Sequence, residues 1–155
     1  MSVEIVRNYF ESNNINKEIL EFPVSSATVE LAAEAVGVEP ARIAKTLSFY
    51  TKEKDGAILI VTAGDMKIDN SKFKHFFGMK AKMLAPEDVE RLTGHAIGGV
   101  CPFGNPDTVT TYLDESLKRF ETVFPAAGSS NSAVEMTCEE LEKYSQAKEW
   151  IDVCK

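Results

Sequence analysis

Two strand-like segments joined by a tight turn constrain the fold of this chain more than any other feature. Residues 43–51 have a strand pattern, Lys54-Asp55-Gly56 has turn chemistry, and residues 57–62 are almost entirely apolar. This order predicts an antiparallel hairpin whose second strand is central in a sheet. Helical patterns flank the hairpin along the chain, so we expect an α+β fold with helices packed on a mixed sheet. A doubly wound parallel sheet is not expected.

Capping residues mark most of the expected helices. An amphipathic helix is expected over residues 2–12. Thr28 and Asp69 are expected to cap helices that Gly37 and Gly78 end, and Pro86 suits the first turn of another helix. Thr137 and Glu140 form a capping box for the last helix. A short helix is expected near residues 114–118, and short strands over residues 18–22, 80–84, 108–113, 122–124 and 133–136.

Composition places the chain among ordinary globular domains. It has 155 residues, of which 44% are hydrophobic and 26% charged, so residues 1–155 are expected to form one domain. There is no apolar run of the ~20 residues that span a bilayer, and the N-terminus has no secretory pattern. The three cysteines are odd in number and suit a reducing cytosol. With only two histidines and no CxxC, we expect neither a zinc or iron site nor a cofactor.

The charge distribution is uneven. The net charge of −7 argues against broad non-specific binding of nucleic acid. However, residues 66–82 contain five lysines and only one acidic residue, Asp69. This basic stretch is either a solvated helix face or a contact for a phosphate backbone. Its lysines are Lys67, Lys72, Lys74, Lys80 and Lys82.

A glycine-rich segment, Gly98-Gly99-Val100-Cys101-Pro102-Phe103-Gly104, fits neither a regular helix nor the middle of a strand. It is either a sharp turn or a loop whose exposed N–H groups hold an oxygen atom of a ligand. Cys101 within it is a candidate nucleophile with His95 as its base, or a small packing residue.

Lys45 lies in an unusual position for a charged residue. In a strand over residues 43–51 it shares a face with Ile43, Leu47 and Phe49. Its stem either extends to water, or its charge protects an edge strand, or its ammonium holds a polar substrate group beside an apolar wall.

Three segments in order resemble one known family. They are Lys45-Thr46-Leu47, the glycine-rich segment 98–104, and Ala127-Gly128-Ser129-Ser130-Asn131. Together with residues 32–38 and 61–65, they resemble the YbaK / prolyl-tRNA editing-domain family of aminoacyl-tRNA deacylases. The resemblance extends from about residue 28 to residue 141.

The resemblance implies a fold and an activity. The fold would be a single domain with a curved, barrel-like mixed sheet surrounded by helices. The activity would be hydrolysis of mischarged aminoacyl-tRNA by a free-standing, cytoplasmic trans-editing enzyme. Its substrate would be tRNA for proline carrying a small wrong amino acid, cysteine or alanine. Contact with prolyl-tRNA synthetase would be transient.

The resemblance also implies a site. Lys45 would be the catalytic lysine, with backbone N–H groups of Gly99 and Val100 stabilising the oxyanion, each such donor contributing about 3 kcal/mol. The basic stretch would bind the tRNA. Substrate-binding residues would be Thr46, Gly98, Cys101, Pro102, Phe103, Gly128, Ser129 and Asn131. Three rivals remain: a non-catalytic module that binds tRNA or an aminoacyl-nucleotide, a Cys101-dependent enzyme, and a partner-binding domain.

Overall fold

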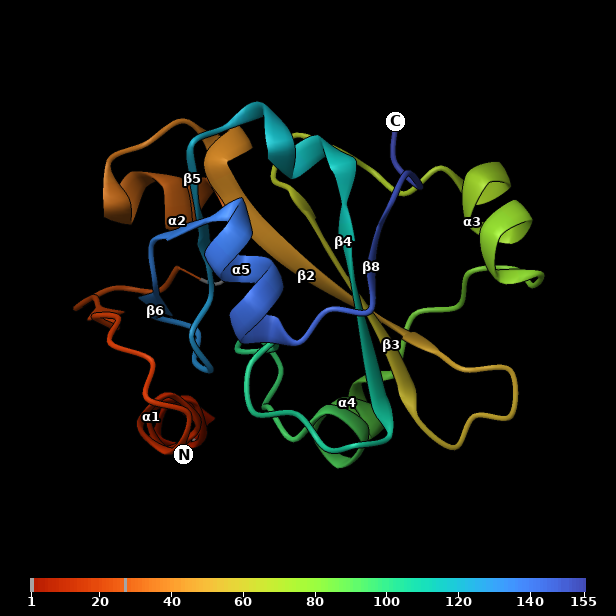
Figure 1. Cartoon of the computed structure of the whole chain (residues 1–155), viewed down its shortest axis with the longest axis horizontal. Helices are drawn as coiled ribbons and strands as arrows, with labels where there is room; N and C mark the ends of the chain where they lie inside the picture. The colour runs from red at the N-terminus through yellow and green to blue at the C-terminus, as the bar shows by residue number, and fades with distance from the viewer. Residues whose placement is uncertain (1, 27) are drawn as a thin grey trace.

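A curled mixed sheet of six strands forms the centre of the molecule, in the order β7-β5-β2-β3-β4-β8 (Figure 1). The structure is a computed structural model that describes residues 2–26 and 28–155. A second sheet pairs β1 with β6. The strands are β1 (Leu20–Glu21), β2 (Ile43–Tyr50), β3 (Ala57–Ala63), β4 (Val109–Asp114), β5 (Thr122–Pro125), β6 (Ser132–Ala133), β7 (Met136–Thr137) and β8 (Glu149–Ile151).

Helices surround this sheet, which confirms the expected α+β class. The α-helices are α1 (Ser2–Ser12), α2 (Val29–Val36), α3 (Asn70–Phe77), α4 (Pro86–Thr93) and α5 (Cys138–Ser145). Short 3-10 helices cover Pro40–Arg42 and Glu115–Arg119. Among the described residues, no helix is long and apolar enough to cross a membrane.

The predicted hairpin is confirmed. β2 and β3 pair antiparallel from Ala44 opposite Ala63 to Tyr50 opposite Ala57. β3 is buried along its whole length because β4 pairs with its other edge, in parallel. The predicted caps also form: the Thr28 hydroxyl accepts from the Leu31 N–H at 3.1 Å, and the Thr137 capping box is complete.

Two expected strands differ from the structure, and one observed strand was not expected. Residues 80–84 form only an isolated bridge at Met83, although the Tyr50 N–H donates to the Lys82 carbonyl at 2.9 Å. The expected strand 133–136 is divided between β6 and β7. β8 was not predicted from the sequence, because three residues are too few to show a period of two.

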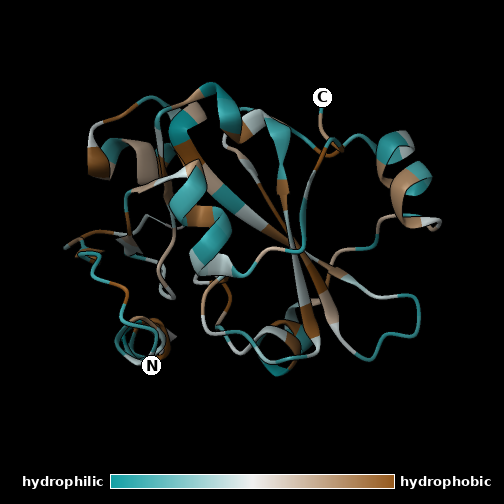
Figure 2. Ribbon diagram, viewed as in Figure 1, coloured by the Kyte–Doolittle hydropathy of each residue, from teal (hydrophilic) through white to brown (hydrophobic). Residues whose placement is uncertain are grey.

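Strand alternation divides the core between the two faces of the sheet. Ile58 and Ile60 point to the face where Phe49 packs on Phe73 of α3. Val61 and Ala63 point to the other face, in a cluster with residues of α1, α5 and the glycine-rich loop. Figure 2 shows apolar residues along the central strands and hydrophilic residues at the β2–β3 turn.

The outer edge of β2 is only partly paired, and this feature positions the site. β5 pairs with β2 only at Ile43 and Ala44. The segment after α3 reaches the same edge further along, where the Leu84 N–H donates to the Ser48 carbonyl at 3.1 Å. Between these two contacts, the edge of β2 faces a cavity.

Asp114 offers a test of how the C-terminal strand is held. Its buried carboxylate accepts from the Ser116 N–H at 3.0 Å and the Val153 N–H at 2.9 Å. We expect Asp114→Ala to lower the free energy of unfolding by about 3 kcal/mol, because it leaves buried N–H groups unpaired. Urea denaturation measures this loss. The exposed Asp107→Ala variant is the control, and equal losses in the two would contradict the assignment.

Candidate active site

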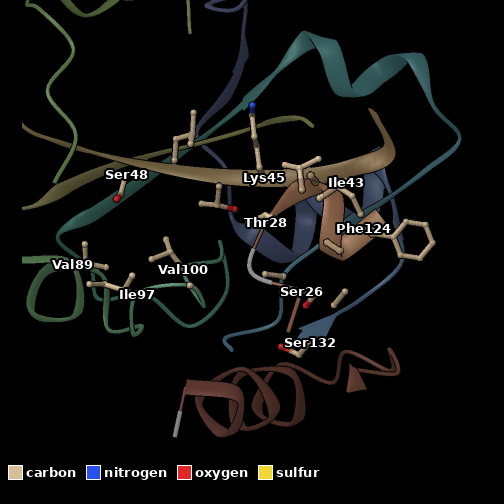
Figure 3. Close-up of a pocket in the computed structure, with 18 of the residues that line it drawn as sticks. Ser26, Thr28, Ile43, Lys45, Ser48, Val89, Ile97, Val100, Phe124 and Ser132 are labelled. Atoms are coloured by element: carbon tan, nitrogen blue, oxygen red, sulfur yellow. The ribbon is translucent and has the colours of Figure 1, made fainter. Parts of the chain in front are cut away.

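A cavity of about 450 Å³ lies at the open edge of β2 (Figure 3). Its walls come from β2, the N-terminal parts of α2 and α4, the start of the glycine-rich loop, and residues of β5 and β6. Both faces of β2 contribute, since Lys45 and Leu47 line the cavity together with Thr46 and Ser48. The cavity therefore wraps around a strand edge, where backbone groups as well as side chains can meet a ligand.

Apolar side chains dominate the walls, and a few hydroxyl groups are placed among them. Thr28, Thr46, Ser48 and Ser132 supply these hydroxyls. The Thr46 hydroxyl oxygen is buried and has no hydrogen-bond partner among residues 2–26 and 28–155. Buried polar atoms are nearly always paired in folded proteins. This hydroxyl is therefore a candidate ligand-binding group.

The start of the glycine-rich loop lines the cavity and carries one of the two predicted oxyanion donors. Gly98 and Val100 line it, with Gly98 in the left-handed region at φ +87°. The Gly99 N–H instead donates to the Ala96 carbonyl at 2.9 Å. The Val100 N–H has no partner in the part of the chain that the structure describes. Of the two predicted oxyanion donors, the structure leaves Val100 available and engages Gly99 within the loop.

Gly99 has a different role, in packing. A Cβ at this position would lie 2.5 Å from the Gly128 carbonyl oxygen, so only glycine lets these two loops touch. Gly128, Ser129 and Asn131 do not line the cavity. They support it from behind, since the Ser129 hydroxyl donates at 2.7 Å to the hydroxyl of Ser132, which does line it.

The later residues of the glycine-rich loop lie outside the cavity. Cys101 and Phe103 are fully buried, and Phe103 packs edge-on against Phe10 of α1 with ring centres 5.2 Å apart. Pro102 borders a separate, smaller cavity of about 220 Å³. The structure thus does not bring these predicted substrate-binding residues to the main cavity. They form the base of the loop instead.

The pair Cys101 and His95 is not arranged for nucleophilic catalysis. The Cys101 sulfur lies 3.5 Å from His95 Nε2, but this nitrogen lies 2.7 Å from the Phe103 carbonyl. A carbonyl only accepts, so Nε2 carries the proton and cannot act as the base. Burial raises the pKa of the Cys101 thiol to about 12 and lowers the pKa of His95. The Cys101 nucleophile is therefore excluded.

Lys45 is oriented differently from the expectation. Its ammonium donates to the Met66 carbonyl. In Figure 3 the side chain extends from β2 away from Val100 and Ile97. The ammonium thus does not face the loop amides in this structure. Lys45 nevertheless supplies the only charged side chain among the described residues that line the cavity.

The five predicted tRNA-binding lysines are dispersed. Lys72 is engaged, pairing with Asp152 at 3.0 Å and donating to the Cys154 carbonyl at 2.9 Å. Lys82 lies beside the cavity residue Met83, with its ammonium 5.6 Å from the Tyr50 ring centre. The other three, Lys67, Lys74 and Lys80, are exposed.

Several cavity residues were not predicted from the sequence. Ser48 follows Thr46 on the same face of β2, so strand alternation could have identified it. Others come from segments without a functional motif, and only tertiary structure brings them together. Among these are Ser26, Met83, Ile97 and Ser132.

The fold and the site together define the class of protein: a curled mixed sheet with a hydroxyl-bearing apolar cavity beside a glycine-rich loop. The aminoacyl-tRNA editing domain family matches residues 24–144, and this chain belongs to that family. Its members are aminoacyl-tRNA deacylases, that is, hydrolases of an ester bond. The recognised family and the expected fold are therefore confirmed.

Similar proteins come from several bacteria. "Uncharacterized protein YwhH" of Bacillus subtilis is 57% identical over 100% of this chain and 98% of its own length. "Putative Cys-tRNA(Pro)/Cys-tRNA(Cys) deacylase EbsC" of Enterococcus faecalis is 31% identical over 74% of this chain and 70% of its own length. A proline–tRNA ligase of Thermosipho melanesiensis is 28% identical over 93% of this chain, which corresponds to 25% of the ligase.

A solved structure agrees with the fold. A crystal structure described as "a putative trans-editing enzyme for prolyl tRNA synthetase" has a TM-score of 0.89 and 32% identity. The alignment covers 99% of this chain and 97% of that one.

The buried thiol generates a prediction. We expect Cys101→Ala to hydrolyse aminoacyl-tRNA within about twofold of the unchanged chain, because a thiol with a pKa near 12 stays protonated and lies outside the cavity. Thiol labelling of the folded protein at pH 8 should modify the partly exposed Cys138 before Cys101. Loss of hydrolysis in Cys101→Ala, with unfolding unchanged, would contradict the exclusion.

Proposed function

We propose that this chain removes a small wrong amino acid, cysteine or alanine, from tRNA for proline, acting in trans on the charged tRNA. The observation that carries the proposal is the cavity between the open edge of β2 and the glycine-rich loop. It is lined by Val100 and Thr46, whose N–H and hydroxyl have no partner among residues 2–26 and 28–155, and by largely apolar walls. The names of EbsC and of the trans-editing structure support the same substrate class.

The chemistry requires little from the protein. An aminoacyl ester is already activated, so water can attack its carbonyl carbon, and the ester bond breaks to release the free amino acid and the ribose hydroxyl of the tRNA. The Val100 N–H would stabilise the negative charge that develops on the carbonyl oxygen, a contribution of about 3 kcal/mol for one donor. The Thr46 hydroxyl would donate to a polar group of the bound aminoacyl moiety. No protein nucleophile is needed in this scheme.

Lys45 would contribute the cation of the site. In the structure its ammonium has one carbonyl partner, that of Met66, and an ammonium carries three donors. Its stem starts at the strand edge around which the cavity wraps. Because the stem has four rotatable bonds, the ammonium can turn toward an anionic or ester oxygen of the substrate.

Selection among amino acids would rest on cavity size. Apolar side chains of Val29, Ile43, Val89 and Phe124 line the cavity and would contact a small acyl side chain. One methylene changes binding in such a site by about 1–3 kcal/mol, so exclusion of larger groups is more effective than discrimination among small ones. We place the activity in the cytoplasm, and contact with prolyl-tRNA synthetase would be transient.

A deacylation panel tests the function. Purified chain is mixed with tRNA for proline charged with cysteine, alanine, serine or proline, and release of the labelled amino acid is followed over time. We expect faster release of cysteine or alanine than of proline. Absence of release from every mischarged species by folded protein would refute the enzyme and leave the non-catalytic binding module.

Lys45 is tested separately. We expect Lys45→Ala and Lys45→Met to lower kcat/KM at least tenfold, because both remove the only charged group lining the described cavity. Lys45→Met keeps most of the apolar stem, so it separates charge from packing. Thermal unfolding confirms that the variants fold. An active Lys45→Met variant would remove the ammonium from the site and leave Lys45 a structural link to Met66.

A further inference from the structure

A small basic platform lies at the end of β2, next to the candidate active site. The ammonium of Lys54 is 5.8 Å, and that of Lys82 is 5.6 Å, from the centre of the same Tyr50 ring. Neither ammonium forms an ion pair with any residue in the ranges 2–26 and 28–155. Two cations thus share one aromatic ring without a carboxylate partner of their own.

The ring between them is held in place. The Tyr50 hydroxyl donates to the Asp88 carboxylate and accepts from the Ala85 N–H at 3.1 Å, at the start of α4. Asp88 is also paired with Arg91 at 2.7 Å, so its charge is already balanced. The exposed Glu87 is a further acidic neighbour of the Tyr50 hydroxyl. The platform is therefore pre-positioned by α4.

The platform lies next to the cavity, further along β2. Tyr50 lies on the same face of β2 as Thr46 and Ser48, which line the cavity. Tyr50 lies four residues after Thr46 along the strand, a distance of about 13 Å. Lys82 directly precedes Met83, a cavity residue with 55% of its surface exposed. An RNA end that enters the cavity at this rim would therefore carry phosphates past both ammonium groups.

Lys72, another lysine of the basic stretch, does not share this position. Lys72 lies on α3. This helix packs, through Phe73 against Phe49, on the face of the sheet opposite to the one that carries Tyr50. Figure 1 shows α3 and α4 on different sides of the central strands. The Lys72 ammonium is already held by Asp152 and the Cys154 carbonyl. It is therefore a matched control for a lysine near the cavity.

From this arrangement we propose that Lys54 and Lys82, fixed around Tyr50, bind phosphates of the RNA that carries the aminoacyl group. The inference rests on the proposed function and deepens it, because it assigns the RNA contact to one edge of the site. Lys54 lies outside the basic stretch of residues 66–82, and only the fold brings it to Lys82. Each phosphate contact releases bound counterions, so binding should weaken as salt rises.

The experiment compares the double variant Lys54→Ala/Lys82→Ala with Lys72→Ala. Binding of uncharged tRNA is measured by filter retention at salt concentrations from about 50 to about 200 mM. Over this range the affinity of a protein that contacts several phosphates falls strongly. We expect the double variant to bind at least about tenfold more weakly at low salt. The slope of log affinity against log salt should fall by roughly 1–2. Lys72→Ala should match the unchanged chain.

A second measurement separates RNA contact from catalysis. Hydrolysis of an aminoacyl-adenosine ester, which has no phosphate, should be the same in the double variant and the unchanged chain, whereas KM for charged tRNA should rise. An unchanged salt slope, an equal loss in Lys72→Ala, or no tRNA binding by the unchanged chain would overturn the proposal. If the unchanged chain binds tRNA but hydrolyses no ester, the deacylase function is refuted. The salt dependence of binding in the double variant and the unchanged chain then still tests whether Lys54 and Lys82 contact the RNA.

Discussion

The early separation of β5 from β2 is the constraint on which the rest of the site depends. The two strands pair only at Ile43 and Ala44, after which β5 ends at Pro125 and the chain continues into the loop of residues 127–131. A fully paired β2 would bury its edge and leave no space beside Thr46. Because the pairing ends, the sheet can curl, and the interior of the curl meets the glycine-rich loop. The cavity is thus a consequence of strand topology and not of a hole in the core.

Close backbone packing then joins the two loops that lie beside that cavity. The loops around Gly99 and Gly128 touch main chain to main chain, at a distance that admits no Cβ on Gly99. Below them, His95 and Phe103 hold the base of the first loop by a hydrogen bond in a fully buried setting. The polar groups offered to a ligand are therefore few, and the scaffold fixes them in place. This suits a reaction whose substrate is already activated.

Much of the fold was readable from the sequence because its local signals agree with its tertiary structure. The hairpin of β2 and β3, the caps at Thr28 and Thr137, and the mixed sheet were all predicted. The site was less accessible to sequence reasoning. Strand alternation placed Lys45 on an apolar face, but it could not show that Met66 holds its ammonium. Nor could motif spacing show that Cys101 and Phe103 turn inward, since a loop's inner and outer residues follow no fixed period.

The first helix, α1, lies outside the residues that the family model matches, yet it packs against the glycine-rich loop. The family match starts at residue 24, whereas α1 ends at Ser12. Yet Phe10 of that helix packs on Phe103, and Ile5 contacts the glycine at position 104. A chain trimmed to the matched residues 24–144 would lose this helix and uncover Phe103 at the base of the glycine-rich loop. The N-terminal helix, outside the family match, therefore belongs to the packing that supports the loop.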